Sequence, residues 1–163
     1  MMKRIGLTIG KFAPFHKGHE YLIETALKYV NKLYVLIYET DVIEISIETR
    51  KKWIEEKFES KNIEVIEAKE PPKKYGMDKG SIKEQTDYIL KLLKKNKIQG
   101  ITHFFSSEEY GKYVAEVLKI ENVLVDKKRI KVPINGTNIR KDLEKYKRYL
   151  SQKVYEDLRK YTE

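Results

Sequence analysis

The sequence contains no cysteine, and no apolar run in it approaches the ~20 residues that a membrane-spanning helix needs. Without thiols the chain can form neither disulfide bonds nor thiolate metal sites. A secretory signal peptide is not expected, because the apolar run near the N-terminus, residues 5–9, is short and already contains Gly6. These absences argue against disulfide-rich secreted proteins and membrane-spanning proteins, and we expect a cytoplasmic protein.

Charge dominates what the sequence does contain. The 163 residues include 34 Lys and Arg against 25 Asp and Glu, a net charge of +9, and 40% are hydrophobic. This length and apolar content suffice for one core, so we expect residues 1–163 to form a single soluble domain. The positive balance has two interpretations: a solvated Lys/Glu-rich surface, or attraction of polyanions such as nucleotides, nucleic acid or anionic lipid.

Strand-like and helix-like segments alternate along the chain. Apolar β-prone runs predict strands at 5–9, 33–38, 63–66, 102–106 and 123–125. Helical spacing predicts helices over 21–30, 46–58, 81–96, 107–118, 136–148 and 151–161. Ser81 is the expected N-cap of its helix, and the Pro- and Gly-containing segment 70–80 is expected to be a loop. The alternation predicts a mostly parallel α/β sheet with helices on both faces and a ligand site at the carboxyl ends of the strands.

The first candidate site is the segment 10–19, Gly-Lys-Phe-Ala-Pro-Phe-His-Lys-Gly-His, directly after the first predicted strand. It places His16 and His19 at or just before a helix N-terminus, where free N–H groups and the helix dipole favour an anion. The two histidines could instead be polar surface, or half of a zinc site that only His103 could extend. The strand–loop–helix context, the flanking glycines and Lys11 favour phosphate binding.

The second candidate site is the segment 134–140, Ile-Asn-Gly-Thr-Asn-Ile-Arg, which is predicted to open another helix. It offers the Thr137 hydroxyl, free N–H groups and the Arg140 guanidinium one turn along. A capping motif with a solvated arginine is the simpler interpretation. A cluster of cations precedes the segment, however: Lys127, Lys128, Arg129 and Lys131. Two anion sites of this kind indicate a nucleoside triphosphate between the N- and C-terminal parts of the sheet.

These two segments resemble the paired motifs of the nucleotidylyltransferase superfamily. Residues 10–19 are similar to its glycine-bounded two-histidine motif, and residues 134–140 to its second motif, usually Ile-Ser-x-Thr-x-x-Arg. Residues 106–110, residues 123–126 with the basic loop after them, and residues 49–53 look like parts of the adenylyltransferase domain of NadR-type proteins. The resemblance covers essentially the whole chain. It implies a Rossmann-like nucleotidyltransferase fold.

The resemblance also implies an activity and a set of site residues. The reaction would transfer AMP from ATP to nicotinamide mononucleotide (NMN), giving NAD and pyrophosphate, with Mg²⁺ held mainly by the phosphates. The implied catalytic residues are His16, His19, Lys11 and Arg140. The implied ATP-binding residues are Gly10, Lys11, Phe12, His16, Gly18, His19, Ser106, Asn135, Gly136, Thr137 and Arg140. The implied acceptor-binding residues are Arg50, Tyr75, Met77 and Lys79.

Two departures from the family pattern keep alternatives open. Asn135 replaces the usual serine, and the segment 75–80 lacks the tryptophan that NadR-type domains use for stacking on nicotinamide. The acceptor could therefore be phosphopantetheine, riboflavin phosphate or, with CTP, a phospho-alcohol. Because Tyr146 and Tyr149 lie among cations, a basic nucleic-acid-binding module is a further, weaker alternative. A homo-oligomer is compatible with the helical C-terminal surface.

Overall fold

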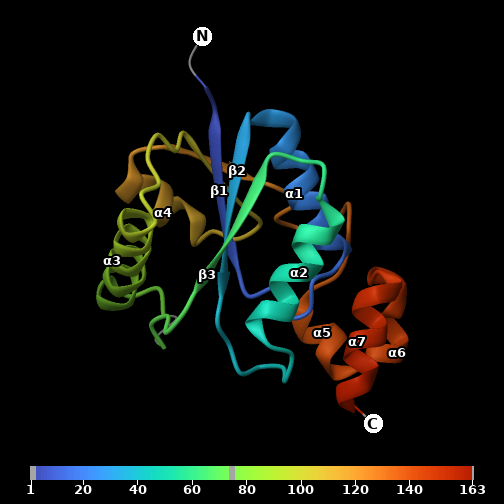
Figure 1. The fold of residues 1–163 in the computed structure, drawn as a ribbon. Helices are drawn as coiled ribbons and strands as arrows, with labels where there is room; N and C mark the ends of the chain where they lie inside the picture. Colours follow the sequence, from blue (N-terminus) through green and yellow to red (C-terminus); the bar gives the residue numbers. More distant parts are fainter. Residues whose placement is uncertain (1–2, 74–75, 163) are drawn as a thin grey trace.

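The structure, a computed structural model, describes residues 3–73 and 76–162 (Figure 1). Five strands form one parallel sheet: β1 (Ile5–Gly10), β2 (Lys32–Tyr38), β3 (Ile63–Ala68), β4 (His103–Ser106) and β5 (Glu121–Leu124). Their order across the sheet is β3-β2-β1-β4-β5. The connections change direction at β1, so the carboxyl ends of β1 and β4 border the crevice where such sheets bind ligands. The predicted parallel α/β fold is confirmed.

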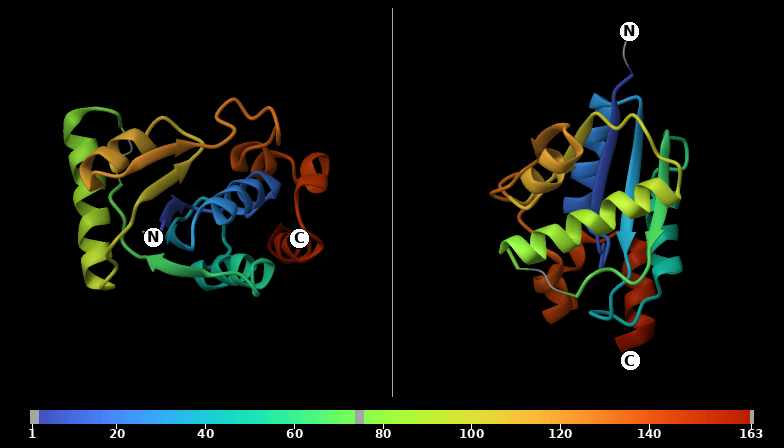
Figure 2. Two further views of the ribbon diagram at one scale, coloured as in Figure 1. Left: turned by 90° about the horizontal axis from the view of Figure 1, so that it is seen from above. Right: turned by 90° about the vertical axis from the view of Figure 1, so that its left-hand side faces the viewer.

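The helices cover both faces of this sheet, as Figures 1 and 2 show. Their bounds are α1 (Lys17–Tyr29), α2 (Ile47–Lys57), α3 (Lys79–Lys95), α4 (Gly111–Leu118), α5 (Gly136–Lys141), α6 (Leu143–Tyr146) and α7 (Gln152–Thr162), with a 3₁₀ turn at Lys147–Tyr149. Helices α1 and α2 lie on one face together with α5 to α7, and α3 and α4 lie on the other. In this three-layer arrangement, the loops that follow the strands lie at the carboxyl edge of the sheet.

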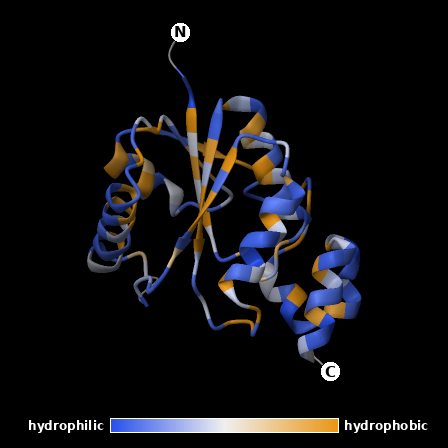
Figure 3. Cartoon of the chain, in the orientation of Figure 1, coloured by the Kyte–Doolittle hydropathy of each residue, from blue (hydrophilic) through white to orange (hydrophobic). Residues whose placement is uncertain are grey.

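Strand β2 shows how the sequence builds the two cores. Its alternate residues Leu33, Val35 and Ile37 are fully buried and belong to one hydrophobic cluster that also includes side chains of α1, α2 and α7. Leu36 points the other way and packs with Ile89 of α3 and other residues of that face. Because both faces are covered, the strand reads as one continuous apolar run in the sequence. Figure 3 shows the same pattern, with hydrophobic strands inside and hydrophilic helix surfaces outside.

Several element boundaries differ from the sequence predictions, and in three cases the structure shows which side chain sets the boundary. Helix α3 begins before Ser81, because the Asp78 carboxylate accepts the Ser81 backbone N–H at 3.0 Å and is the actual N-cap. Helix α4 begins only at Gly111, since the Ser106 hydroxyl donates to the Glu108 carbonyl and holds a turn before it. The helix expected over 136–148 is interrupted at Asp142, whose side chain accepts the N–H of Lys145 and starts α6.

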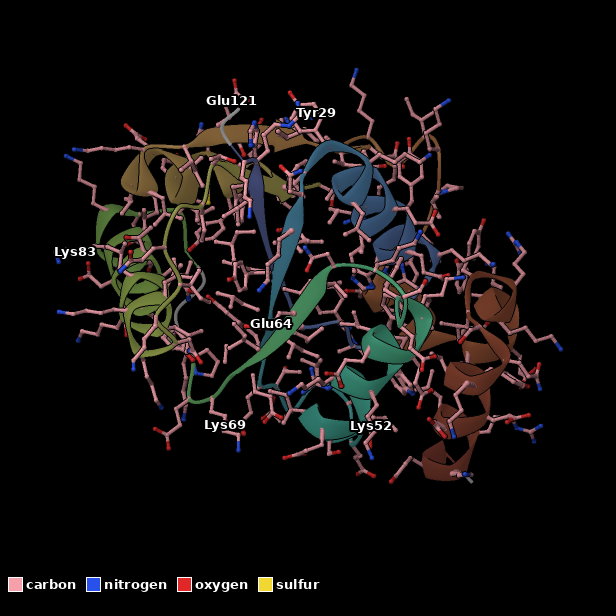
Figure 4. The ribbon with its side chains drawn as sticks, turned by 45° about the horizontal axis from the view of Figure 1, so that its top comes forward. Tyr29, Lys52, Glu64, Lys69, Lys83 and Glu121 are labelled. Carbon is pink, nitrogen blue, oxygen red and sulfur yellow. The ribbon has the colours of Figure 1, made fainter. Side chains whose placement is uncertain are left out.

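The opposite edge of the sheet, at the amino ends of β4 and β5, carries His103. Its Nε2 lies 2.8 Å from a Glu121 carboxylate oxygen, and the Tyr29 ring packs edge-on at 5.1 Å. Figure 4 shows Glu121 and Tyr29 close together at this edge, whereas Lys52, Lys69 and Lys83 lie elsewhere on the surface. His103 therefore lies far from the segment 10–19 and cannot complete a metal site with it.

Candidate functional site

The segment 10–19 forms the turn from β1 into α1, and its two histidines cap that helix. His16 is the N-cap residue, and its Nδ1 accepts the backbone N–H of Gly18 at 3.0 Å. His19 reaches back, and its Nδ1 accepts the backbone N–H of His16 at 3.2 Å. The pair is thus a capping box in which imidazoles replace the usual hydroxyl and carboxylate. The prediction that both histidines lie at a helix N-terminus is confirmed.

The capping bonds fix which ring nitrogen carries the proton. Because each Nδ1 accepts a backbone N–H, each neutral imidazole carries its proton on Nε2, which is a donor. Burial, and then the charge of Arg129, lower the pKa of His16 to about 3. Burial, followed by the neighbouring His16 and Arg129, lowers the pKa of His19 well below its ordinary value. Both rings are therefore neutral Nε2–H donors at pH 7.

Aromatic packing holds the His19 ring in this orientation. The ring stacks on His16 at 3.8 Å between centroids and contacts Phe12 at 4.7 Å. Phe12 is itself buried and has a left-handed backbone, with φ of 48°, which a phenylalanine adopts at a cost. Gly18 is needed beside the pair, since a Cβ there would lie 2.8 Å from the His16 ring. The loop is built to present two ordered imidazoles.

The segment 134–140 opens α5 next to this loop. Asn135 is the N-cap and accepts the backbone N–H of Asn138 at 2.8 Å, so the residue that replaces serine performs the capping. The guanidinium of Arg140 donates to the Ala13 carbonyl at 2.7 Å and to the Thr137 hydroxyl at 3.2 Å. A Cβ at Gly136 would lie 3.0 Å from that guanidinium and 3.2 Å from the Ala13 oxygen. One arginine thus joins two motifs that are 127 residues apart.

Arg129 is a third cation at this site, and the sequence analysis did not separate it from its neighbours. It is half-buried, donates to the Ile134 carbonyl at 3.0 Å, and its charge acts on both histidines. The loop that carries it is ordered by Asp126, whose carboxylate accepts the N–H groups of Ile130, Lys131 and Val132 at 2.8–2.9 Å. The only signal for Arg129 in the sequence is that it is one of four cations before the second motif.

The remaining predicted ATP-binding residues lie at the carboxyl ends of β1 and β4. Gly10 ends β1, Lys11 follows it half-buried, and Ser106 ends β4. Thr137 is exposed in the first turn of α5. The structure therefore brings the predicted ATP-binding residues to one edge of the sheet around the β1–β4 crevice.

The predicted acceptor-binding residues are not brought together in this way. Met77 is exposed just before α3, and Lys79 is the first residue of that helix and is also exposed. Tyr75 lies outside the described residues. Arg50 is only 1% exposed, and its guanidinium donates to the carbonyls of Ile45, Tyr38 and Lys11. A side chain enclosed in this way directs its donors at backbone carbonyls and does not face the open site.

The chemistry of the site is that of an anion receptor. It combines neutral imidazole donors, two guanidinium groups and the N-termini of α1 and α5. Within residues 3–73 and 76–162, no three or more His, Asp or Glu side chains gather so that they could hold a metal ion. No helix in the described part of the chain is long and apolar enough to cross a membrane. The arrangement is suited to several connected phosphate groups.

The comparison with protein families decides the relationship of this chain. Residues 6–151 match the family described as the citrate lyase ligase C-terminal domain. The chain belongs to this family. The resemblance to NadR-type nucleotidyltransferases is also confirmed. The chain matches a NadR relative in sequence, and its structure matches those of a NadR protein and an NMN adenylyltransferase.

The trifunctional NAD biosynthesis/regulator protein NadR of Escherichia coli (strain K12) is 30% identical to this chain over 168 residues. That alignment covers 93% of this chain and 40% of NadR, so the chain spans less than half of its relative.

Two solved structures share the fold of this chain. A NadR protein in complex with NAD and AMP-PNP superposes with a TM-score of 0.64 at 20% identity, covering 90% of this chain and 44% of that one. A bifunctional NMN adenylyltransferase/ADP ribose pyrophosphatase from Francisella tularensis, complexed with AMP and a manganese ion, gives 0.60 at 24% identity, covering 96% and 52%. The predicted Rossmann-like nucleotidyltransferase fold is thereby confirmed.

Proposed function

We propose that this domain transfers the adenylyl group of ATP to the phosphate of nicotinamide mononucleotide, giving NAD and pyrophosphate. The observation that carries the proposal is the bond from Arg140 to the Ala13 carbonyl, which brings the α5 N-terminus against the histidine loop, residues 10–19. Together they would form one continuous phosphate receptor with two helix N-termini, and in the described part of the chain no carboxylates gather there into a metal-binding cluster. NadR and the Francisella protein, whose names refer to NAD biosynthesis and NMN adenylylation, support this choice of reaction.

The reaction needs neither a covalent enzyme intermediate nor a general base. An oxygen of the acceptor phosphate, already ionised at pH 7, attacks the α-phosphorus of ATP and forms the new P–O bond. The bond between the α-phosphorus and the bridging oxygen breaks, and pyrophosphate leaves with the electron pair. Catalysis then consists of aligning two phosphates and stabilising the negative charge that develops on the leaving group.

The residues of the site suit these tasks. The Nε2–H groups of His16 and His19 would donate to ATP phosphate oxygens without bringing a titrating charge. Lys11, Arg129 and Arg140 would neutralise charge on the β- and γ-phosphates. Mg²⁺ would arrive with ATP, held mainly by its phosphates, and would neutralise part of their negative charge. Thr137 would hydrogen-bond a phosphate, and Ser106 would lie near the adenosine.

Recognition of the acceptor would depend on side chains outside the two phosphate-binding motifs. The only tryptophan of the chain, Trp53, is 4% exposed and donates to Asp157 at 2.8 Å, so it cannot stack on a nicotinamide ring. Met77 and Lys79 would instead contact the acceptor from the start of α3. Tyr75, which lies outside the described residues, is proposed as a further contact. The second candidate function, favoured by this absence, is the same transfer to another phosphorylated acceptor such as phosphopantetheine or riboflavin phosphate.

A panel of acceptors tests the proposal. Purified protein is given ATP and Mg²⁺ with NMN, phosphopantetheine, riboflavin phosphate or phosphocholine, with CTP as an alternative nucleotide, and pyrophosphate release is followed. Release with ATP and NMN, together with formation of NAD, is the expected result. Pyrophosphate release only with another acceptor would support nucleotidyl transfer but show that NMN is not the substrate. Absence of release with every acceptor, from folded protein, would overturn the proposal.

A further inference from the structure

Arg50 lies in the first turn of α2 and is among the largest fully buried side chains of the protein. It sits in the core on the α1–α2 side of the sheet, yet its guanidinium lies under the carboxyl ends of β1 and β2. Burial lowers its pKa, and only the exposed carboxylates of Glu39 and Glu48 act in the opposite direction. A buried cation of this kind costs free energy that an apolar residue of similar volume would not. Its position therefore calls for an explanation other than stability.

The hydrogen bonds of Arg50 supply that explanation. Its Nε donates to the Ile45 carbonyl at 3.3 Å, and Nη1 donates to the Tyr38 carbonyl at 3.0 Å and to the Lys11 carbonyl. These three oxygens belong to the loop before α2, the end of β2 and the histidine loop. A planar guanidinium with its fixed donors can hold three separate backbone segments in one geometry.

The Lys11 carbonyl is the point at which Arg50 reaches the site. The peptide unit that contains this oxygen also contains the nitrogen of Phe12, whose φ of 48° lies in the left-handed region. A residue in that conformation persists only where its surroundings hold it. The Phe12 ring then contacts the His19 ring at 4.7 Å. A continuous path therefore leads from Arg50 through Lys11 and Phe12 to His19.

We propose that Arg50 is a positioning residue, which holds the histidine loop in place by binding the Lys11 carbonyl and does not contact the acceptor. The inference rests on the proposed adenylyl transfer. Loss of the hydrogen bond from Arg50 to the Lys11 carbonyl would displace Lys11 and the His19 Nε2–H relative to the phosphates, while the acceptor would still bind. A displacement of about 1 Å costs on the order of 10²-fold in rate.

Arg50→Lys is the most informative variant, because it keeps the positive charge and removes the fork of donors. Two readouts are measured on the full chain: the split between kcat and the acceptor KM, and the ring-nitrogen chemical shifts of His19 by NMR. We expect kcat to fall by roughly 10²-fold with the acceptor KM changed by less than about threefold. The His19 ring-nitrogen shifts should change, since its contact with Phe12 is altered.

The matched control is Trp53→Phe, one turn further along the same helix. Trp53 is buried and bonded to Asp157 but donates nothing to the histidine loop. The Trp53→Phe substitution should lower the free energy of unfolding and leave kcat and the His19 ring-nitrogen shifts unchanged. If Trp53→Phe reproduces the Arg50→Lys changes, general loosening of α2 explains them and the positioning role is wrong. An increase of about tenfold or more in the acceptor KM at unchanged kcat would likewise overturn it in favour of direct contact.

Phe12→Leu supplies a second test if Arg50→Lys does not fold. It breaks the path at the ring that contacts His19 and leaves Arg50 in place. A lower kcat with changed His19 shifts is expected, and unchanged values of both would overturn the proposed path. Failure of the proposed function would look different, because the wild-type protein would then turn over no acceptor. In that case the His19 shifts of the variants decide the positioning role alone.

Discussion

At the scale of single residues, the site depends on two imidazoles that act as backbone caps on one ring nitrogen and as donors on the other. His16 and His19 each accept an N–H through Nδ1, which leaves Nε2–H for a ligand. Their neutral state follows from burial and from the nearby Arg129. A site of this kind stabilises anions with dipoles whose orientation is set before the ligand binds.

Replacing His19 by alanine should lower turnover by about 10²- to 10³-fold, the usual effect of losing one preorganised donor. Stability should fall only by about 1 kcal/mol, because one capping bond is lost and the ring is not fully buried. Steady-state kinetics and a urea melt of the variant measure the two effects. His103→Ala, at the opposite edge of the sheet, is the control and should leave turnover unchanged. Near-normal turnover in His19→Ala would contradict the assignment.

The lowered pKa values of the two histidines should make stability depend on pH. In the folded protein the pKa of His16 is about 3 instead of 6.5, so below pH 6.5 the unfolded chain binds protons that the folded chain does not. Stability should therefore be constant above pH 6.5 and fall towards acid, by about 1.4 kcal/mol per pH unit for each such histidine. Urea midpoints between pH 8 and pH 5 measure this, before the carboxylates titrate.

His16→Asn provides the control for this pH dependence. Asparagine is a good N-cap, so the helix start should survive, and it carries no titrating group. The slope below pH 6.5 should become shallower in this variant. An unchanged slope would show that His16 does not contribute to the pH dependence.

At the scale of elements, two short turns place the N-termini of α1 and α5 side by side. Gly136→Ala tests how closely they must approach, because the added Cβ would meet the Arg140 guanidinium at 3.0 Å and the Ala13 backbone oxygen at 3.2 Å. Arg140 would be displaced, and ATP binding, measured by calorimetry, should weaken by about tenfold, equal to the loss of one good hydrogen bond to a charged group.

Gly80→Ala is the matched control for this change. It lies in the first turn of α3, where a Cβ would make only an ordinary contact at 3.4 Å with the Asp78 carboxylate. It should leave ATP binding unchanged and raise stability by about 0.5–1 kcal/mol, since alanine is favoured over glycine in a helix. Equal effects of the two substitutions on ATP affinity would contradict a specific role of the α5 N-terminus.

The bond between Trp53 of α2 and Asp157 of α7 holds the C-terminal helix against the sheet layer. Both groups are buried, and the bond is 2.8 Å long. Trp53→Phe leaves the Asp157 carboxylate with Lys153 at 3.3 Å and Lys160 at 3.9 Å, and should lower the free energy of unfolding by about 1–3 kcal/mol. Chemical denaturation measures it. No change in the midpoint would mean that the two lysines satisfy the carboxylate.

The sequence predicts the elements better than their ends. Apolar runs indicate all five strands, and the signal is clearest for β2, which is buried on both faces. Strand β5 has no buried residue, and the predicted strand 123–125 overlaps it only at Val123 and Leu124. The ends depend on which side chain wins a competition for a backbone group, as Asp78 does over Ser81 and as Asp142 does in ending α5. Those outcomes depend on local geometry that residue spacing does not contain.

At the scale of the whole molecule, the strand order brings the beginning and the end of the chain together. Strand β1 lies between β2 and β4, so the histidine loop at its carboxyl end borders the crevice. The segment after β5 then brings α5 to the same place. The sequence motifs predicted both segments that the structure brings together here. The burial of Arg50 could not be predicted, because it depends on backbone carbonyls that are distant from it in the sequence. The placement of Arg129 could not be predicted either, because it depends on a loop that Asp126 holds in shape.

The central claim is that the adenylyl group, and no other part of ATP, passes to a phosphorylated acceptor at this site. Incubation with NMN, Mg²⁺ and ATP labelled either at the α- or at the γ-phosphate tests it directly. We expect the α-label to appear in NAD and the γ-label in pyrophosphate. Transfer of the γ-label to the acceptor, or retention of both labels in ATP by folded, ATP-binding protein across every acceptor tried, would contradict it.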